Sequence, residues 1–232
     1  MRPEVTRGRP QPVMPDLFAP DPAAELTEPM LLPLAPGAML IRGSAAPHAD
    51  KLWADLQRVL GAAPPRHMVT PGGFRMSVAM SNCGTMGWVS DASGYRYDAI
   101  DPDSGRPWPP LSASFLDAAR RAAGEAGYRD FAPDACLISR YEPGARLTLH
   151  QDRDEEDFGQ PIVSISLGLP AVFLFGGLKR SVKAVRVPVD HGDVVVWGGA
   201  ARLRYHGVAA LVDGLHPLTG RFRFNLSFRR AG

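Results

Sequence analysis

A histidine and an aspartate stand two residues apart at the end of an apolar run, in TLHQDRDEE (148–156). On a β-strand, residues i and i+2 point to the same face, so His150 and Asp152 could share one metal ion. An HxD pair alone is more often a solvated hydrogen-bonded pair, so a third ligand is needed. His206 is the candidate, because RLRYHG places it at the expected end of another strand. Two histidines and one carboxylate leave coordination positions open, which is typical of non-haem Fe(II) rather than of a closed zinc site.

A strict alternation of apolar and polar residues indicates a β-strand in RFRFNLSFRR (221–230). Its two faces comprise Phe222, Phe224, Leu226 and Phe228 on one side and Arg223, Asn225, Ser227 and Arg229 on the other. One interpretation is a strand whose polar face lies in water. The other is a receptor for a dicarboxylate, because a guanidinium binds a carboxylate through two parallel hydrogen bonds. Beside an open metal site, the second interpretation predicts an acidic cosubstrate held between metal and arginine.

Two amphipathic helices and a series of short strands must position these residues. Apolar residues recur at helical spacing in 47–61 and 112–127, with Gly61 and Gly127 as expected C-terminal caps. After residue 134, eight short β runs alternate with turns rich in Gly, Pro and Asp. The sequence therefore predicts a mainly β protein with flanking helices (α+β), built as two packed sheets. Between the helices, the Gly-, Met- and aromatic-rich segment 69–102 is typical of a binding loop or lid.

The overall composition narrows the class of protein. The 232 residues are enough for one sizeable core, and a net charge of +2 means that contact with nucleic acid requires a local basic patch. No apolar run reaches about 18 residues, so we predict no membrane segment. Two distant cysteines predict neither a thiolate zinc site nor a disulfide framework, which suits a reducing, cytoplasmic compartment. Ten of the 23 prolines precede residue 48, so we predict a disordered tail over 1–15 and an extended strap over 16–47.

Five segments together resemble the AlkB family of Fe(II)/2-oxoglutarate-dependent dioxygenases. They are MVTPGGFRMSVAMSNCG, PDACLISRYEPGARLTLHQDRDE, PIVSISLGLPAVFLFGGLKR, HGDVVVWGG and FRFNLSFRRAG. The resemblance runs from about Leu31 to Gly232. It implies a double-stranded β-helix (jelly-roll) core over 134–232, inside a single dioxygenase domain of residues 16–232 with a nucleotide-recognition lid over 68–105.

The same resemblance implies a reaction. The protein would oxidatively demethylate alkylated bases, N1-methyladenine and N3-methylcytosine, in single- or double-stranded DNA. Fe(II) would be the cofactor, 2-oxoglutarate and dioxygen the cosubstrates, and formaldehyde, succinate and carbon dioxide the products. The enzyme would act as a monomer in the cytoplasm.

The family pattern also assigns roles to individual positions of this chain. His150, Asp152 and His206 would bind iron. The residues that it implies for 2-oxoglutarate are Tyr141, Ser139, Arg223, Asn225 and Arg229. Arg223 would pair with the distal carboxylate, and Arg229 would lie beside that position. Ser139 departs from the family, which has asparagine there; serine is shorter, so its contact with 2-oxoglutarate would be weaker.

A second group of positions corresponds to the family's base-binding residues. They are Trp88, Tyr95, Asp154, Thr70, Met80 and Arg180. Trp88 would stack on a base flipped out of the helix, with His150 on the other face. Asp154 would face the base edge and favour methylated bases that carry positive charge. The neighbouring Arg153, Glu155 and Glu156 are interpreted as solvated charges.

Simpler interpretations exist for several of these positions. An isolated tryptophan is more often a core residue, although the glycines and serines around Trp88 favour an exposed loop. Met80 fits core filling equally well, and Arg180 fits a solvated loop.

Competing classes of function also remain open in the sequence. The same chemistry could act on methylated RNA or on a protein side chain. A non-catalytic jelly-roll binding module or a metal hydrolase could keep the same HxD and histidine residues.

Overall fold

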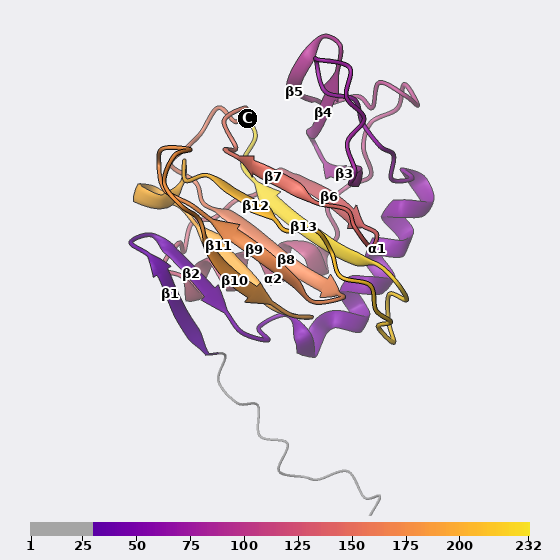
Figure 1. Ribbon diagram of the computed structural model, residues 1–232. Coiled ribbons are helices and arrows are strands. Elements are labelled where there is room, and N and C mark those ends of the chain that lie inside the picture. The colour runs from indigo at the N-terminus through magenta and orange to yellow at the C-terminus, as the bar shows by residue number, and fades with distance from the viewer. Residues whose placement is uncertain (1–29) are drawn as a thin grey trace, which may run out of the picture.

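The computed structural model describes residues 30–232, which form two main β-sheets, a separate two-stranded hairpin and two α-helices (Figure 1). The larger sheet has the order β1-β2-β11-β8-β13-β6-β3 and the smaller one β10-β9-β12-β7. In the larger sheet, the strands in spatial order are β1 (Leu31–Ala35), β2 (Ala38–Ile41), β11 (Val194–Trp197), β8 (Ile162–Gly168), β13 (Arg223–Arg229), β6 (Ala135–Tyr141) and β3 (Ala79–Gly84). In the smaller sheet they are β10 (Val185–Val189), β9 (Ala171–Phe175), β12 (His206–Val208) and β7 (Leu147–His150). The predicted mainly β architecture with flanking helices is therefore confirmed.

All eight strands expected after residue 134 are present, but one boundary differs. His206 begins β12 rather than ending a strand, because the residues before it form a 3₁₀ turn over Gly199–Ala201 and an irregular link. The prediction of a strand that precedes His206 is therefore wrong, because the strand follows this histidine. The consequence for the site is small, since His206 still lies at a strand end.

The two helices pack on the larger sheet and form the main core with it. They are α1 (Ala49–Ala62) and α2 (Ala113–Glu125). From α1, Leu52 and Leu56 are buried, and from α2 the ring of Phe115 meets Phe228 of β13 edge-on at 5.9 Å between centroids. Burial of each such side chain stabilises the fold by about 1.5–3 kcal/mol. The helices therefore pack against the apolar face of β13, the strand whose opposite face carries the polar site residues.

The ends of α2 follow local sequence signals, whereas the C-terminal end of α1 does not. Ser112 caps α2, because its hydroxyl accepts the backbone N–H of Phe115 at 3.2 Å. Gly127 follows α2 with φ +92°, the left-handed conformation expected of a terminating glycine. The cap predicted at Gly61 is wrong, because α1 continues through it to Ala62.

The described part of the predicted strap is not irregular, since residues 31–41 form a β-hairpin. Its second strand, β2, pairs with β11 and extends the larger sheet, while β1 is the outer edge. Pro33 is tolerated there because an edge strand need not use every backbone N–H. The predicted tail over 1–15 lies outside the described residues.

A separate two-stranded hairpin, β4 (Gly87–Asp91) and β5 (Gly94–Asp98), stands beyond the end of the sheets near β3, at the top of Figure 1. It falls within the segment predicted to be a lid. Within residues 30–232, no helix is long and apolar enough to cross a bilayer.

Candidate metal and cosubstrate site

Two histidines from neighbouring strands of the smaller sheet face each other. His150 ends β7, His206 begins β12, and the two are direct cross-strand partners with ring centroids 4.3 Å apart. Each Nδ1 lies close to a backbone carbonyl two residues earlier, at 2.9 Å from Thr148 and 3.1 Å from Arg204. A carbonyl can only accept, so each Nδ1 carries the hydrogen and each Nε2 keeps a free lone pair.

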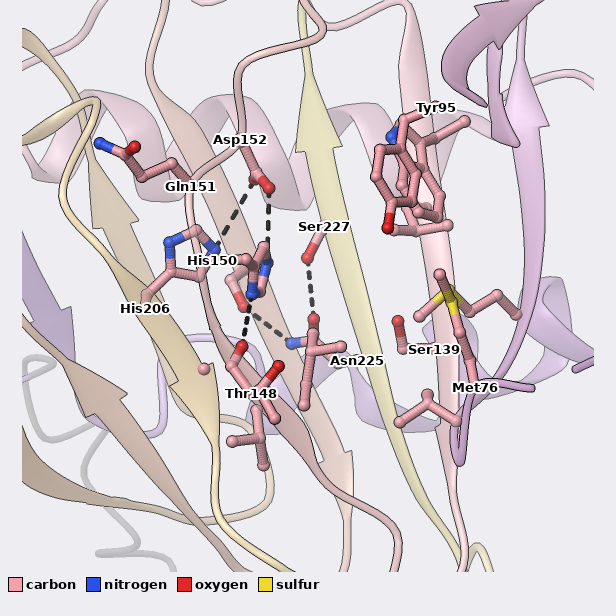
Figure 2. A pocket seen from close by; sticks show the side chains of 18 of the residues that line it. Met76, Tyr95, Ser139, Thr148, His150, Gln151, Asp152, His206, Asn225 and Ser227 are labelled. Atoms are coloured by element: carbon pink, nitrogen blue, oxygen red, sulfur yellow. Dashed lines mark hydrogen bonds and ion pairs between the residues drawn. The ribbon is translucent and has the colours of Figure 1, made fainter. Parts of the chain in front are cut away.

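The carboxylate of Asp152 completes the group. His150 Nε2 is 3.5 Å from Asp152 Oδ1, and His206 Nε2 is 3.8 Å from Oδ2. One ligand atom from each of the three residues can be chosen so that all lie within 4.8 Å of one another. Figure 2 shows the two imidazoles and the carboxylate directed toward one another.

The protonation states suit a divalent metal ion. Burial, together with the neighbouring His150, lowers the pKa of His206 to about 3, so its imidazole is the neutral form that can ligate. For Asp152, burial alone would raise the pKa, but the charge of Arg229 outweighs it and holds the pKa well below its usual value. A neutral imidazole and an ionised carboxylate beside free Nε2 atoms fit Fe(II) bound by two histidines and one carboxylate.

The metal-site residues line a cavity of about 870 Å³ that also contains most of the predicted binding residues. These are Tyr141, Ser139, Arg223, Asn225, Arg229, Trp88, Tyr95, Asp154, Thr70 and Met80. Arg180 is the exception: it is exposed, does not line the cavity, and lies over the ring of Tyr205 at 5.8 Å.

Arg223 is a buried cation with unused donors. Its side chain comes from β13 and is 2% exposed; Nη2 donates to Ser166 at 3.0 Å, whereas Nε and Nη1 have no hydrogen-bond partner among the described residues. The guanidinium lies over the ring of Tyr141 at 5.2 Å, and burial lowers its pKa. A buried charge without a counterion is costly, so this position fits an incoming carboxylate.

The remaining polar residues of β13 already have partners. Asn225 donates to Ser164 at 2.7 Å and accepts from Ser227 at 2.8 Å, as Figure 2 shows for the second bond. Every residue of β13 is buried, so the interpretation with its polar face in water is wrong. Ser139 on β6 is the direct neighbour of Asn225 and is 3% exposed.

Arg229 is placed against the metal carboxylate. Its Nη2 and Nε lie 2.6 and 2.9 Å from Asp152 Oδ2. It lines the cavity as expected of a residue beside the cosubstrate, but its most direct contact is with a metal ligand.

The lid hairpin presents Trp88 toward the same cavity. The sequence favoured an exposed loop here, but Trp88 is a half-buried residue of β4 that stacks on Tyr95 with centroids 5.6 Å apart. Its Nε1 donates to Asp154 at 2.7 Å. Its backbone is held by the buried side chain of Asn82 on β3, which accepts the Trp88 N–H at 3.0 Å and donates to its carbonyl at 2.9 Å.

The sequence did not predict the buried position of Glu155 at the site. Glu155 was expected to be solvated, yet it is 6% exposed and contacts Arg202, Arg229 and Tyr97. The local run DRDEED gives no signal for this burial, because the partners come from distant strands and turns.

A jelly-roll cavity that combines a His-x-Asp and distant-histidine triad with a buried unpaired arginine defines an iron- and keto-acid-dependent oxygenase. Comparison with known proteins agrees, since the model of the 2OG-Fe(II) oxygenase superfamily matches residues 37–229. The alpha-ketoglutarate-dependent dioxygenase AlkB of Escherichia coli (strain K12) is 54% identical over 217 residues, covering 94% of this chain and 98% of that protein. The chain therefore belongs to the 2OG-Fe(II) oxygenase superfamily and, within it, to the AlkB family.

Two more distant relatives share the fold or the chemistry. The DNA N(6)-methyladenine demethylase ALKBH1D of Arabidopsis thaliana is 32% identical over 225 residues, covering 84% of this chain and 50% of that protein. The solved structure of OsALKBH1 superposes with a TM-score of 0.74 at 28% identity, covering 87% of this chain and 100% of that one. The predicted dioxygenase class, with Fe(II) as cofactor and 2-oxoglutarate and dioxygen as cosubstrates, is confirmed.

Proposed function

We propose that this dioxygenase oxidatively demethylates alkylated bases in DNA, with N1-methyladenine and N3-methylcytosine as substrates. The observation that carries the proposal is the placement of an aromatic platform, Trp88, and a carboxylate, Asp154, on the same cavity as the metal triad. The similarity to the DNA N(6)-methyladenine demethylase of Arabidopsis supports a nucleobase as the class of substrate. Formaldehyde, succinate and carbon dioxide would be the products.

In this proposal each part of the cavity has one task. His150, Asp152 and His206 hold the iron, which together with 2-oxoglutarate and dioxygen supplies the oxidation of the N-methyl carbon. Arg223 binds the distal carboxylate of 2-oxoglutarate through its free Nε and Nη1, and Tyr141 covers its guanidinium. A volume of about 870 Å³ is within the range that accommodates a small cosubstrate and one base.

The lid residues recognise the base in this proposal. Trp88 stacks on a flipped base, which recovers part of the energy lost when that base leaves the duplex. Asp154 contributes selectivity, because N1-methyladenine and N3-methylcytosine are cations while the parent bases are neutral. At about 4 Å and an effective dielectric constant of about 20, a carboxylate favours a cation by on the order of 4 kcal/mol.

Formaldehyde release from three substrates tests the proposal. Matched oligonucleotides of DNA and RNA with one N1-methyladenine, and a methylated peptide, are incubated with Fe(II), 2-oxoglutarate and air. We expect release from DNA to be the fastest. Release from the peptide alone would contradict the proposal, and faster release from RNA would transfer it to methylated RNA.

Replacement of Trp88 tests the base platform separately. Trp88→Ala should raise the KM for a methylated oligonucleotide by roughly 5- to 100-fold, because base–aromatic stacking is worth about 1–3 kcal/mol. The KM for 2-oxoglutarate should stay within twofold. Trp88→Phe is the matched control, since it keeps a stacking ring and loses only the Nε1 bond to Asp154. An equal loss of affinity for both substrates would instead indicate a folding role for Trp88.

Several finer features belong to the same proposal. We infer one dioxygenase domain, predicted over 16–232 with its first residues, 16–29, outside the described part of the chain, a recognition lid over 68–105 and a jelly-roll core over 134–232. We also infer a monomer in the cytoplasm; the two buried, free cysteines, Cys83 and Cys136, agree with the reducing compartment.

A further inference from the structure

A buried carboxylate, Glu155, lies between the metal site and the lid hairpin. Its side chain is 2% exposed, although it belongs to a strongly charged segment. Its Oε1 is 3.2 Å from Arg229 Nε, and its Oε2 is 3.1 Å from Arg202 Nη2. Burying a carboxylate at this depth is costly unless cationic groups pair with it, so the position of Glu155 depends on both arginines.

On the side of the metal site, both arginines contact Asp152. Arg229 contacts Asp152 Oδ2 through Nη2 and Nε, at 2.6 and 2.9 Å. Arg202 Nη1 donates to the backbone carbonyl of Asp152 at 3.0 Å. The orientation of the metal carboxylate is therefore set by the guanidinium of Arg229, whose other charged partner is Glu155.

On the side of the lid hairpin, Glu155 contacts one tyrosine, Tyr97. Tyr97 on β5 donates its hydroxyl to Glu155 Oε1 at 2.8 Å, and it is the direct cross-strand partner of Trp88 on β4. Burial raises the pKa of the Tyr97 phenol well above its usual value, so the hydroxyl stays a donor. Glu155 Oε1 thus accepts the hydrogen bond of the lid tyrosine and also forms an ion pair with Arg229.

We propose that Glu155 is a positioning residue that couples the seating of the lid hairpin to the orientation of the Asp152 carboxylate. With the lid seated, Tyr97 shares Oε1 with Arg229, and the arginine keeps its bonds to Asp152. When the lid lifts, Oε1 loses one donor and attracts Arg229 more strongly, away from Asp152. The role of the lid as base platform rests on the proposed function; the coupling itself requires only the lid and the metal site.

Three single variants, one double variant and two measurements test the coupling. The single variants are Glu155→Gln, Tyr97→Phe and the matched control Glu156→Gln, whose side chain is exposed on the same segment. The first two are also combined in one double variant. Affinity for Co(II), a redox-inert probe, is measured by titration of the metal-free protein with 2-oxoglutarate present. Seating of the lid is measured by amide hydrogen exchange over residues 87–98 in the same samples, without nucleic acid.

We expect Glu155→Gln to weaken Co(II) binding by roughly 10- to 100-fold, the usual effect of losing a group that orients a metal ligand, and to speed exchange in the lid. Tyr97→Phe should speed exchange as much and weaken Co(II) binding severalfold, although it changes no charge. The double variant should be no worse than Glu155→Gln alone, because both act along one path. Glu156→Gln should change neither quantity.

Two results would overturn the proposal. One is Co(II) affinity within twofold of the unmodified protein in both Tyr97→Phe and Glu155→Gln. The other is faster lid exchange in Tyr97→Phe with unchanged Co(II) affinity, which would make Tyr97 a purely structural lid residue. Should Glu155→Gln fail to fold, Tyr97→Phe decides alone. Neither measurement uses a methylated substrate, so a wrong assignment of the substrate would leave these results interpretable.

Discussion

Asp152→Ala should lower formaldehyde release by at least about 1,000-fold. The carboxylate is the only acidic member of the triad and supplies the negative charge that would hold Fe(II) beside the two histidines. Its loss also leaves Arg229 without its 2.6 Å partner, so that Glu155 is its remaining charged partner and the positive charge next to the metal position is less well compensated. Both effects oppose metal binding, so activity should not return at high Fe(II) concentration.

An anaerobic titration separates this loss from unfolding. Fe(II) and 2-oxoglutarate should give a weak visible charge-transfer band with the unmodified protein and none with Asp152→Ala. Circular dichroism of both proteins checks that the fold is kept, and Asp157→Ala serves as an exposed acidic control on the same segment. More than a tenth of the normal turnover in Asp152→Ala would show that Asp152 is not an iron ligand.

Arg223→Lys should raise the KM for 2-oxoglutarate by about 100-fold while the charge of the site is unchanged. The free Nε and Nη1 of Arg223 form a rigid fork that matches both oxygens of a carboxylate. An ammonium offers point contacts only, and the loss of one charge-assisted hydrogen bond costs about 1.5–3 kcal/mol. At saturating 2-oxoglutarate, kcat should recover substantially, since the metal ligands are intact.

Arg221→Lys is the matched control for this measurement. Arg221 precedes Arg223 by two residues but is exposed and pairs with Asp213 at 2.6 Å, away from the cavity lining. Its replacement should leave the KM for 2-oxoglutarate within twofold. If Arg223→Lys changed only the KM for the oligonucleotide, the guanidinium would have to be reassigned to the nucleic acid.

The strands and the metal triad were predictable because they depend on local patterns. Period-2 alternation identified β13, and strand-end polar residues identified His150 and His206, whose cross-strand pairing brings the two rings together. The described hairpin over 31–41 was missed because its prolines argued against regular structure. An edge strand tolerates Pro33, and edge position is a property of the whole sheet that local composition does not contain.

The burial of the charged side chain of Glu155 could not be predicted from the sequence. Glu155 and Glu156 are adjacent and chemically identical, yet the first is buried and the second exposed. The difference comes from Arg202 and Arg229, which lie more than 40 residues away in the chain and converge only after the two sheets have closed. The contact between Trp88 and Asp154 has the same origin, since the two residues lie far apart in the sequence and meet only in the folded chain.

The clamp of Asn82 on the backbone of Trp88 has a thermodynamic consequence. A side-chain amide from a buried strand fixes both the N–H and the carbonyl of the lid residue before any ligand arrives. If Trp88 stacks on a base as proposed, its own backbone has already lost conformational freedom during folding, so little ordering entropy remains to be lost at this residue when the base binds. Selectivity can then depend on how well the base fits, because the backbone of Trp88 is fixed and does not rearrange to accommodate a base of another shape.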